Sequence, residues 1–142
     1  MSDAAFGILS RPGKNGLIEY LLVVTKHDYG EYTGHWYPAG GAVDAGESDK
    51  DCVVREIKEE LDIDVEAIRK IAEYPGDLPG IQTHWWECRM KDPTQIISLK
   101  VSELAAYRWV SEDVIKNGTL PLWPATRKIF EEYVLPPSLP RG

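Results

Sequence analysis

The stretch that decides the fold is residues 40–63, GGAVDAGESDKDCVVREIKEELDI. Two glycines lead through a polar loop into a segment whose apolar residues recur at helical spacing. Ser48 is a favourable N-cap, and the acidic residues that follow it suit the positive end of a helix dipole. The pattern predicts an amphipathic helix over residues 48–61. In the loop before it, Gly40 and Gly41 allow backbone conformations that other residues avoid.

Three glutamates of this helix, Glu56, Glu59 and Glu60, project within about a third of its circumference, beside the apolar stripe. Like charges three or four residues apart repel by about 0.2–0.5 kcal/mol per exposed pair, and by more at the edge of a core. A divalent cation bound through oxygen atoms would relieve that repulsion. The alternative is a solvated acidic face, eased by Arg55 and Lys58. The glycine-containing loop favours a site, because its backbone can approach a phosphate or offer a carbonyl oxygen to a metal.

This arrangement resembles the signature of the Nudix hydrolase family, and within it the MutT-like enzymes. The matching positions run from Gly41 through Glu47, Arg55-Glu56, Ile57 and Glu59-Glu60 to Leu61 and Ile63, preceded by Pro38-Ala39-Gly40-Gly41. Asp62 stands where the family usually has glycine. Aspartate tolerates the left-handed conformation better than most residues, so Asp62 is expected to end the helix and not to bind metal.

The resemblance implies roles for individual residues. Magnesium, with manganese as a substitute, would be held by the Gly40 carbonyl, Glu56, Glu59 and Glu60. Arg55 would pair with Glu47 and orient these carboxylates, which gives it a catalytic role as well. Metal ions would bridge the substrate phosphates and activate the attacking water.

The general base is left open between Glu56 and Glu103. Glu103 lies six residues before Trp109, and related enzymes carry a catalytic or metal-binding glutamate before a similar Arg-Trp strand. The alternative is that Glu103 only begins a solvated turn.

Substrate recognition is less constrained than the metal site. Gly41, His35, Trp36 and Trp86 are the candidate substrate-binding residues. Strand alternation places Trp85 and Trp86 on opposite faces of a sheet, so at most one faces a pocket. For each aromatic residue and histidine, packing in the core is the alternative.

The predicted reaction is hydrolysis of a pyrophosphate bond in a substrate linked to a nucleoside diphosphate. The simplest version is a nucleoside triphosphate, ordinary or oxidised, cut to monophosphate and pyrophosphate. ADP-ribose is an alternative because Nudix enzymes that act on it often carry a proline about sixteen residues past the signature, and Pro79 resembles that proline. A dinucleoside polyphosphate is another alternative, because His35-Trp36 before Pro38 resembles enzymes that act on such substrates. A noncatalytic Nudix-fold module that binds a nucleotide or protein is a different class of function. Such modules usually lose the glutamates that this chain keeps.

The rest of the chain alternates strand and helix patterns, which predicts a mixed α/β fold. The expected architecture is a Nudix-like α/β/α sandwich, with one domain over residues 1–134 and a flexible tail over residues 135–142. Predicted strands cover residues 4–10, 17–26, 35–37, 65–74, 81–90, 94–101 and 107–110, and two further helices cover residues 112–117 and 124–133.

Composition narrows the partners and the compartment. A net charge of −7 argues against binding to nucleic acid or to an anionic membrane. No apolar run is long enough to span a bilayer, and residues 1–5 do not resemble a signal peptide. Cys52 and Cys88 are therefore predicted to be reduced thiols in a cytoplasmic protein. The chain is expected to be a monomer or a homodimer, with an edge strand over residues 4–10 available for pairing.

Overall fold

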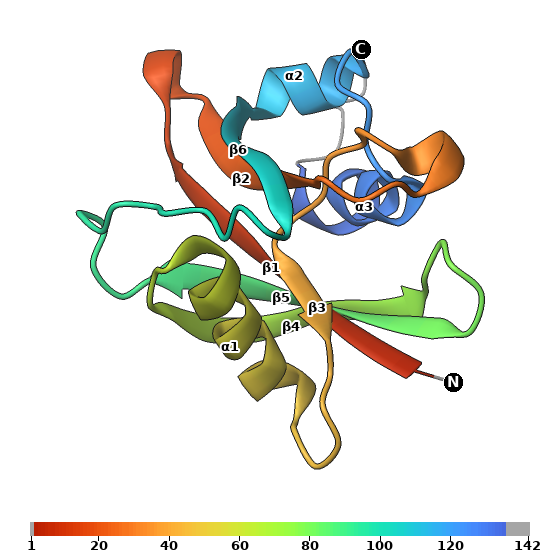
Figure 1. Cartoon of the computed structure of the whole chain (residues 1–142). Helices are drawn as coiled ribbons and strands as arrows, with labels where there is room; N and C mark the ends of the chain where they lie inside the picture. Colours follow the sequence, from red (N-terminus) through yellow and green to blue (C-terminus); the bar gives the residue numbers. More distant parts are fainter. Residues whose placement is uncertain (1, 136–142) are drawn as a thin grey trace.

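The computed structural model describes residues 2–135 (Figure 1). Its strands are β1 (Ser2–Pro12), β2 (Ile18–Thr25), β3 (Gly40–Ala42), β4 (Val65–Pro75), β5 (Ile81–Met90) and β6 (Leu104–Ser111). Its helices are α1 (Asp49–Leu61), α2 (Glu112–Asn117) and α3 (Pro124–Ile129). Short helical turns are η1 (Lys14–Gly16), η2 (Gly30–Tyr32) and η3 (Phe130–Val134), the last of which continues α3.

Strand β1 is the centre of the sheet, whose order is β4-β5-β1-β2-β6. The first part of β1 pairs in parallel with β5 and antiparallel with β3, and its last residues pair antiparallel with β2. The two halves of the sheet therefore share one strand. The expectation that residues 4–10 form an edge strand is wrong, since residues 4–6 pair with both β5 and β3 and Ser10 pairs with β2.

Helices cover the sheet from opposite sides, which makes the predicted three-layer, single-domain sandwich (Figure 1). Neighbouring residues of β1 show the alternation: Leu9 packs in one hydrophobic cluster with residues of α1, and Ile8 packs in the other with residues of α3. Trp86 packs against the cluster of α1 and Trp85 in the cluster of α3, as strand alternation predicts. Within residues 2–135, no helix is both long and apolar enough to cross a membrane.

The strand predicted over residues 94–101 does not form. The segment instead crosses the end of α1, where Ser98 N donates to Leu61 O at 3.0 Å and Lys100 N donates to Glu60 O at 2.9 Å. Carbonyl groups in the last turn of a helix have no partner inside the helix, so they can take the place of a neighbouring strand. We call residues 94–103 the strap, because they connect α1 to the end of β2.

Smaller differences concern the ends of elements. Residues 35–37, predicted as a strand, form only two isolated bridges, from Tyr37 to Val23 and from Trp36 to Leu122. The short strand β3 was not predicted. Leu135, the first residue of the predicted tail, is buried in the hydrophobic cluster of α3, and the rest of the tail lies outside the described residues.

Candidate active site

Helix α1 begins and ends as its sequence predicts. The Ser48 hydroxyl accepts a hydrogen bond from Asp51 N at 3.0 Å, which caps the first turn. Asp62 ends the helix with φ at 56° and ψ at 37°, in the left-handed region that glycine usually occupies there. The glutamates of α1 are thus carried on a helix that is fixed at both ends.

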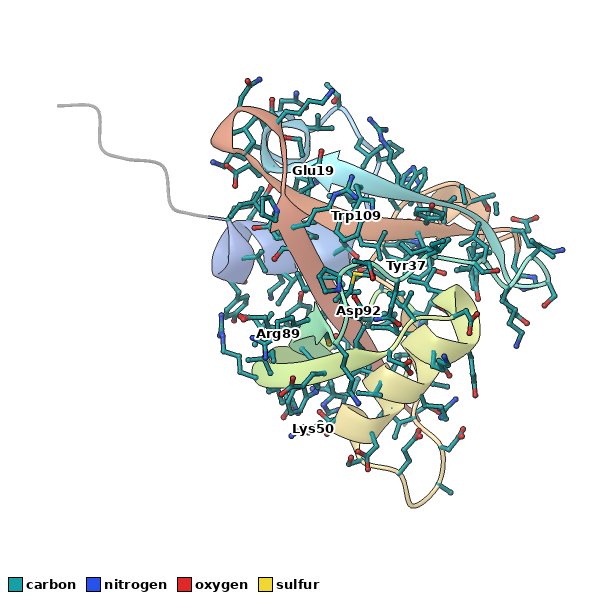
Figure 2. All side chains as sticks on the ribbon, turned by 90° about the vertical axis from the view of Figure 1, so that its left-hand side faces the viewer. Glu19, Tyr37, Lys50, Arg89, Asp92 and Trp109 are labelled. Atoms are coloured by element: carbon teal, nitrogen blue, oxygen red, sulfur yellow. The ribbon has the colours of Figure 1, made fainter. Side chains whose placement is uncertain are left out.

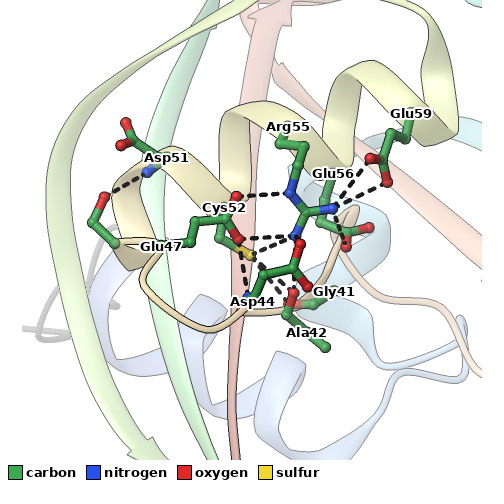
Figure 3. Close-up of polar contacts among 10 residues, drawn as sticks. Gly41, Ala42, Asp44, Glu47, Asp51, Cys52, Arg55, Glu56 and Glu59 are labelled. Carbon is green, nitrogen blue, oxygen red and sulfur yellow. Dashed lines mark hydrogen bonds and ion pairs between the residues drawn. The ribbon is translucent and has the colours of Figure 1, made fainter.

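Arg55 is the centre of the polar network on α1 (Figure 3). Its Nε and Nη2 donate to the two carboxylate oxygens of Glu47 at 2.7 and 2.9 Å, as predicted for this pair. Its Nη1 donates to Glu56 at 3.0 Å and to Glu59 at 3.1 Å, and its Nη2 also reaches the Ala42 carbonyl at 3.1 Å. The hydrogen bonds from Arg55 lower the pKa of Glu47 to about 2. One guanidinium therefore ties the loop before α1 to two of its glutamates.

Gly40 and Gly41 are required for space and not for backbone freedom, since neither has a positive φ. A Cβ on Gly40 would lie 2.0 Å from Ala5 O, because β3 passes very close to β1. A Cβ on Gly41 would lie 2.6 Å from Cδ of Glu56. The expectation of unusual backbone conformations at this pair is wrong. What the pair provides is close approach of backbone to backbone and of backbone to carboxylate.

Glu60 is the most perturbed carboxylate of the site. Its Oε2 is buried and has no hydrogen-bond partner within residues 2–135. Burial raises the pKa of Glu60 to about 8, with a further contribution from the charge of Glu56 and a smaller one from Glu103, against a hydrogen bond from the Gly40 backbone. Burial also raises the pKa of Glu56, against the opposing effect of Arg55.

The buried oxygen of Glu60 has the chemistry to bind a divalent cation. A buried carboxylate oxygen without a donor is costly unless a cation or a proton neutralises it. In the described part of the chain, no three His, Cys, Asp or Glu side chains already lie in a metal-binding arrangement. In the structure Glu56 and Glu59 turn toward Arg55, while Glu60 is the member of the set whose buried oxygen has no partner among the described residues.

A cavity of about 270 Å³ adjoins Glu60. Its acidic lining consists of Glu60, Glu103 and Asp77, and both glycines of the β3 pair also line it. Aromatic side chains form much of the remaining wall: Phe6, Tyr29, Tyr37, Trp85 and Trp123. Figure 2 shows the partly buried Tyr37 near the middle of the view and Lys50 at its lower edge. The cavity thus combines carboxylates with flat apolar surfaces.

The predicted site residues divide between this cavity and other places. The structure brings Gly40, Gly41, Glu60 and Glu103 into the cavity lining, while Arg55, Glu56 and Glu59 form the adjoining network.

Trp86 lies on the other face of β5, where its Nε1 donates to Asp49 Oδ2 at 2.8 Å. His35 packs edge-on against Tyr32, and Trp36 packs against the cluster of α3. None of these three lines the cavity, so their role as substrate-binding residues stays a prediction.

Sequence reasoning missed a histidine and an aspartate of the cavity. His27 lies after β2, and its Nε2 is 3.0 Å from Oε2 of Glu103. Asp77 lies in the loop between β4 and β5, and its carboxylate accepts from Ala125 N at 3.0 Å, at the start of α3. Both residues sit in loops without a motif, so only the folded chain shows that they reach the cavity.

Comparison with known proteins agrees with this geometry. A family model described as the NUDIX domain matches residues 1–133. The chain belongs to the Nudix family. Nudix hydrolases generally use a divalent metal, which is consistent with the orphaned oxygen of Glu60.

Several relatives carry a named activity. The CTP pyrophosphohydrolase of Escherichia coli is 28% identical over 137 residues, which cover 94% of this chain and 92% of the relative. The mouse (Mus musculus) asymmetrical bis(5'-nucleosyl)-tetraphosphatase is 31% identical over 68% of this chain and 66% of its own length. The structure of an ADP-ribose pyrophosphatase from Streptococcus suis is 26% identical, with a TM-score of 0.64 over 88% of this chain and 81% of that one. These relatives differ in substrate, so similarity alone does not select among them.

Proposed function

We propose that this Nudix pyrophosphohydrolase cleaves a nucleoside triphosphate, ordinary or oxidised, to the monophosphate and pyrophosphate, with Mg²⁺ as its metal and Mn²⁺ as a substitute. One observation carries the proposal: Glu60, whose Oε2 is buried without a partner, lines a cavity with aromatic walls. The acidic lining can bind a cation that carries the substrate phosphates, and the aromatic walls can contact a nucleobase.

The metal would be held by Glu60, Glu56, Glu59 and the Gly40 carbonyl. When bound, such a cation neutralises phosphate charge and lowers the pKa of an attacking water. Arg55 orients Glu56 and Glu59 through its hydrogen bonds at 3.0 and 3.1 Å. Glu103 and Glu56 are the carboxylates available to take the proton of the water, and Glu103 lines the cavity.

The nucleobase of the substrate would lie among the aromatic side chains of the cavity. Phe6 stacks on the buried Trp85 with ring centroids 5.0 Å apart, and Tyr37 and Trp123 contribute other parts of the lining. Every nucleobase has a π face, and stacking on an aromatic side chain contributes about 1–3 kcal/mol per base. Such walls accept different bases, which is consistent with the variety of substrates among the relatives.

Two other substrate classes have support from relatives. The mouse relative acts on bis(5'-nucleosyl) tetraphosphates and the Streptococcus relative on ADP-ribose. The residues that prompted these alternatives do not line the cavity: Pro79 is exposed in the β4–β5 loop, and His35 and Trp36 pack elsewhere. The triphosphate of the E. coli relative, which matches nearly the whole chain, is therefore the first choice.

A substrate panel tests the proposal. The protein is incubated with Mg²⁺ and ordinary and oxidised triphosphates, ADP-ribose, diadenosine tetraphosphate and a nucleotide sugar, in water enriched in ¹⁸O. Mass spectrometry of the products identifies both the broken bond and the phosphorus atom that was attacked. We expect monophosphate and pyrophosphate from a triphosphate, no product without a divalent metal, and loss of turnover in Glu60→Gln.

Preference for ADP-ribose or the tetraphosphate would replace the triphosphate with that class. No turnover of any compound would favour a noncatalytic binding module. Lys14→Gln, in turn η1 outside the cavity lining, is the control variant and should retain full activity.

A further inference from the structure

The region around Glu103 is built to hold this carboxylate in one place. The strap is fixed to α1 through Ser98 and Lys100, and its other end is fixed to β2. There Lys26 N and the Thr25 hydroxyl both donate to Glu103 O, each at 3.2 Å. The strap is thus tied to two elements that are far apart in sequence, and Glu103 lies at the end tied to β2.

A bulge lies at the same point. Val24 faces Ala106 across the β2–β6 ladder, but Thr25 faces Leu104, so β6 carries one extra residue here. Bulges re-aim the side chains beside them and are common next to active sites. Glu103 directly precedes this irregularity and lines the cavity with Glu60.

The carboxylate itself is held by His27. His27 Nε2 lies 3.0 Å from Oε2 of Glu103, and both side chains are about half exposed. His27 N donates to the Thr25 hydroxyl at 3.1 Å, the same hydroxyl that donates to Glu103 O. Thr25 is buried, so it links the backbones of His27 and Glu103 through one fixed group. Backbone and side chain of Glu103 are therefore both anchored to residues 25–27.

We propose that His27 is a positioning residue that aims the Glu103 carboxylate at the attacking water. The inference rests on the proposed function and takes Glu103, of its two candidate carboxylates, as the general base. A carboxylate only accepts hydrogen bonds, so Nε2 of His27 must carry a proton. A general base must be within hydrogen-bond reach of the water it activates, and a misplacement of about 1 Å can reduce the rate about 100-fold.

Kinetics of two substitutions test this role. His27→Ala removes the donor and should lower kcat about 10- to 100-fold, with KM changed by less than about twofold. His27→Gln keeps a donor N–H and should recover much of that loss. In a Glu103→Gln background, His27→Ala should have little further effect, since residues that act as a unit are not additive.

A second measurement does not depend on turnover. In the metal-free protein, long-range ¹H–¹⁵N NMR spectra report which nitrogen of a histidine ring carries the proton. We expect His27 to be protonated at Nε2 in the wild type, and to populate both neutral tautomers in Glu103→Ala. This result would stand even if the substrate panel showed no turnover, so it separates the two proposals.

Three outcomes would overturn the inference. A higher KM with unchanged kcat in His27→Ala would make His27 a substrate contact. A full loss of kcat on top of Glu103→Gln would show that His27 acts independently of Glu103. An unprotonated Nε2 in the wild type would exclude the hydrogen bond itself.

Discussion

The guanidinium of Arg55 grips both carboxylate oxygens of Glu47, with Nε to Oε2 at 2.7 Å and Nη2 to Oε1 at 2.9 Å. This pair spans the junction between the loop and helix α1. The same guanidinium also contacts Glu56 and Glu59, so the geometry of the loop and of the glutamates depends on one planar group.

Replacing Arg55 by lysine should therefore disturb the site without removing the positive charge. Lysine cannot make two parallel hydrogen bonds to Glu47 and also reach the glutamates of α1. We expect kcat to fall about 10- to 100-fold, the range seen for residues that orient metal ligands. The control is Arg89→Lys, the same substitution in an exposed pair with Glu66, which should change nothing. Equal activity of both variants would show that charge alone suffices at position 55.

The two glycines of β3 should respond differently to alanine. In Gly41→Ala the new Cβ meets the Glu56 carboxylate, which is the end of a side chain and can turn away. In Gly40→Ala it meets the backbone oxygen of Ala5, which cannot move without separating β3 from β1. We expect Gly41→Ala to fold with a nearly unchanged Tm and reduced kcat, and Gly40→Ala to lose much of its stability. Thermal unfolding with steady-state kinetics checks both, and equal Tm losses would contradict the distinction.

Stability of the metal-free protein should depend on Glu60 and on pH. The pKa of Glu60 is about 8 in the folded protein against an ordinary value of 4.5. Its carboxyl therefore contributes fully to folding below about pH 4.5. That contribution is lost as the pH rises toward 8, because folding then buries the ionised carboxylate of Glu60, whose Oε2 has no hydrogen-bond donor among the described residues.

Glu60→Gln should consequently be more stable than wild type at pH 9, by up to about 5 kcal/mol, with the difference vanishing near pH 4. Denaturant unfolding in the presence of a chelator measures it. Glu66→Gln, at an exposed position of β4, is the control and should show no such pH dependence. A Glu60→Gln variant that is less stable at high pH would contradict the assignment.

The sequence predicted α1 nearly residue by residue, because its cap, its apolar stripe and its left-handed end are all local signals. It failed at residues 94–101, although the alternation there is real: Ile97 and Leu99 pack on the core while Ile96 is exposed. Alternation shows which face is buried but not what pairs with the backbone, and here the partner is the end of a helix. The His27–Glu103 contact was hidden for a similar reason, since it joins residues 76 positions apart.

The end of α1 offers a test of the aspartate in place of the family's glycine. Asp62 occupies the left-handed region at a cost that glycine does not have. Asp62→Gly loses an exposed ion pair with Lys58 at 3.4 Å, which contributes little. We expect a net gain of about 0.5 kcal/mol, and a loss of about 1 kcal/mol for Asp62→Val, whose branched side chain resists this conformation. Chemical denaturation of both variants measures these changes, and a stable Asp62→Val would contradict the reading.

Two tryptophans separate substrate binding from packing. Trp86 faces α1, and its Nε1 donates to Asp49 Oδ2, so Trp86→Phe should lower Tm while leaving KM unchanged. Trp123 lines the cavity, and Trp123→Leu should raise KM about 5- to 100-fold, because stacking contributes about 1–3 kcal/mol per base. Steady-state kinetics at a temperature well below both Tm values makes the comparison fair. A raised KM in Trp86→Phe would indicate that the substrate binds on the side of the sheet that α1 covers. An unchanged KM in Trp123→Leu would show that the nucleobase does not stack on Trp123.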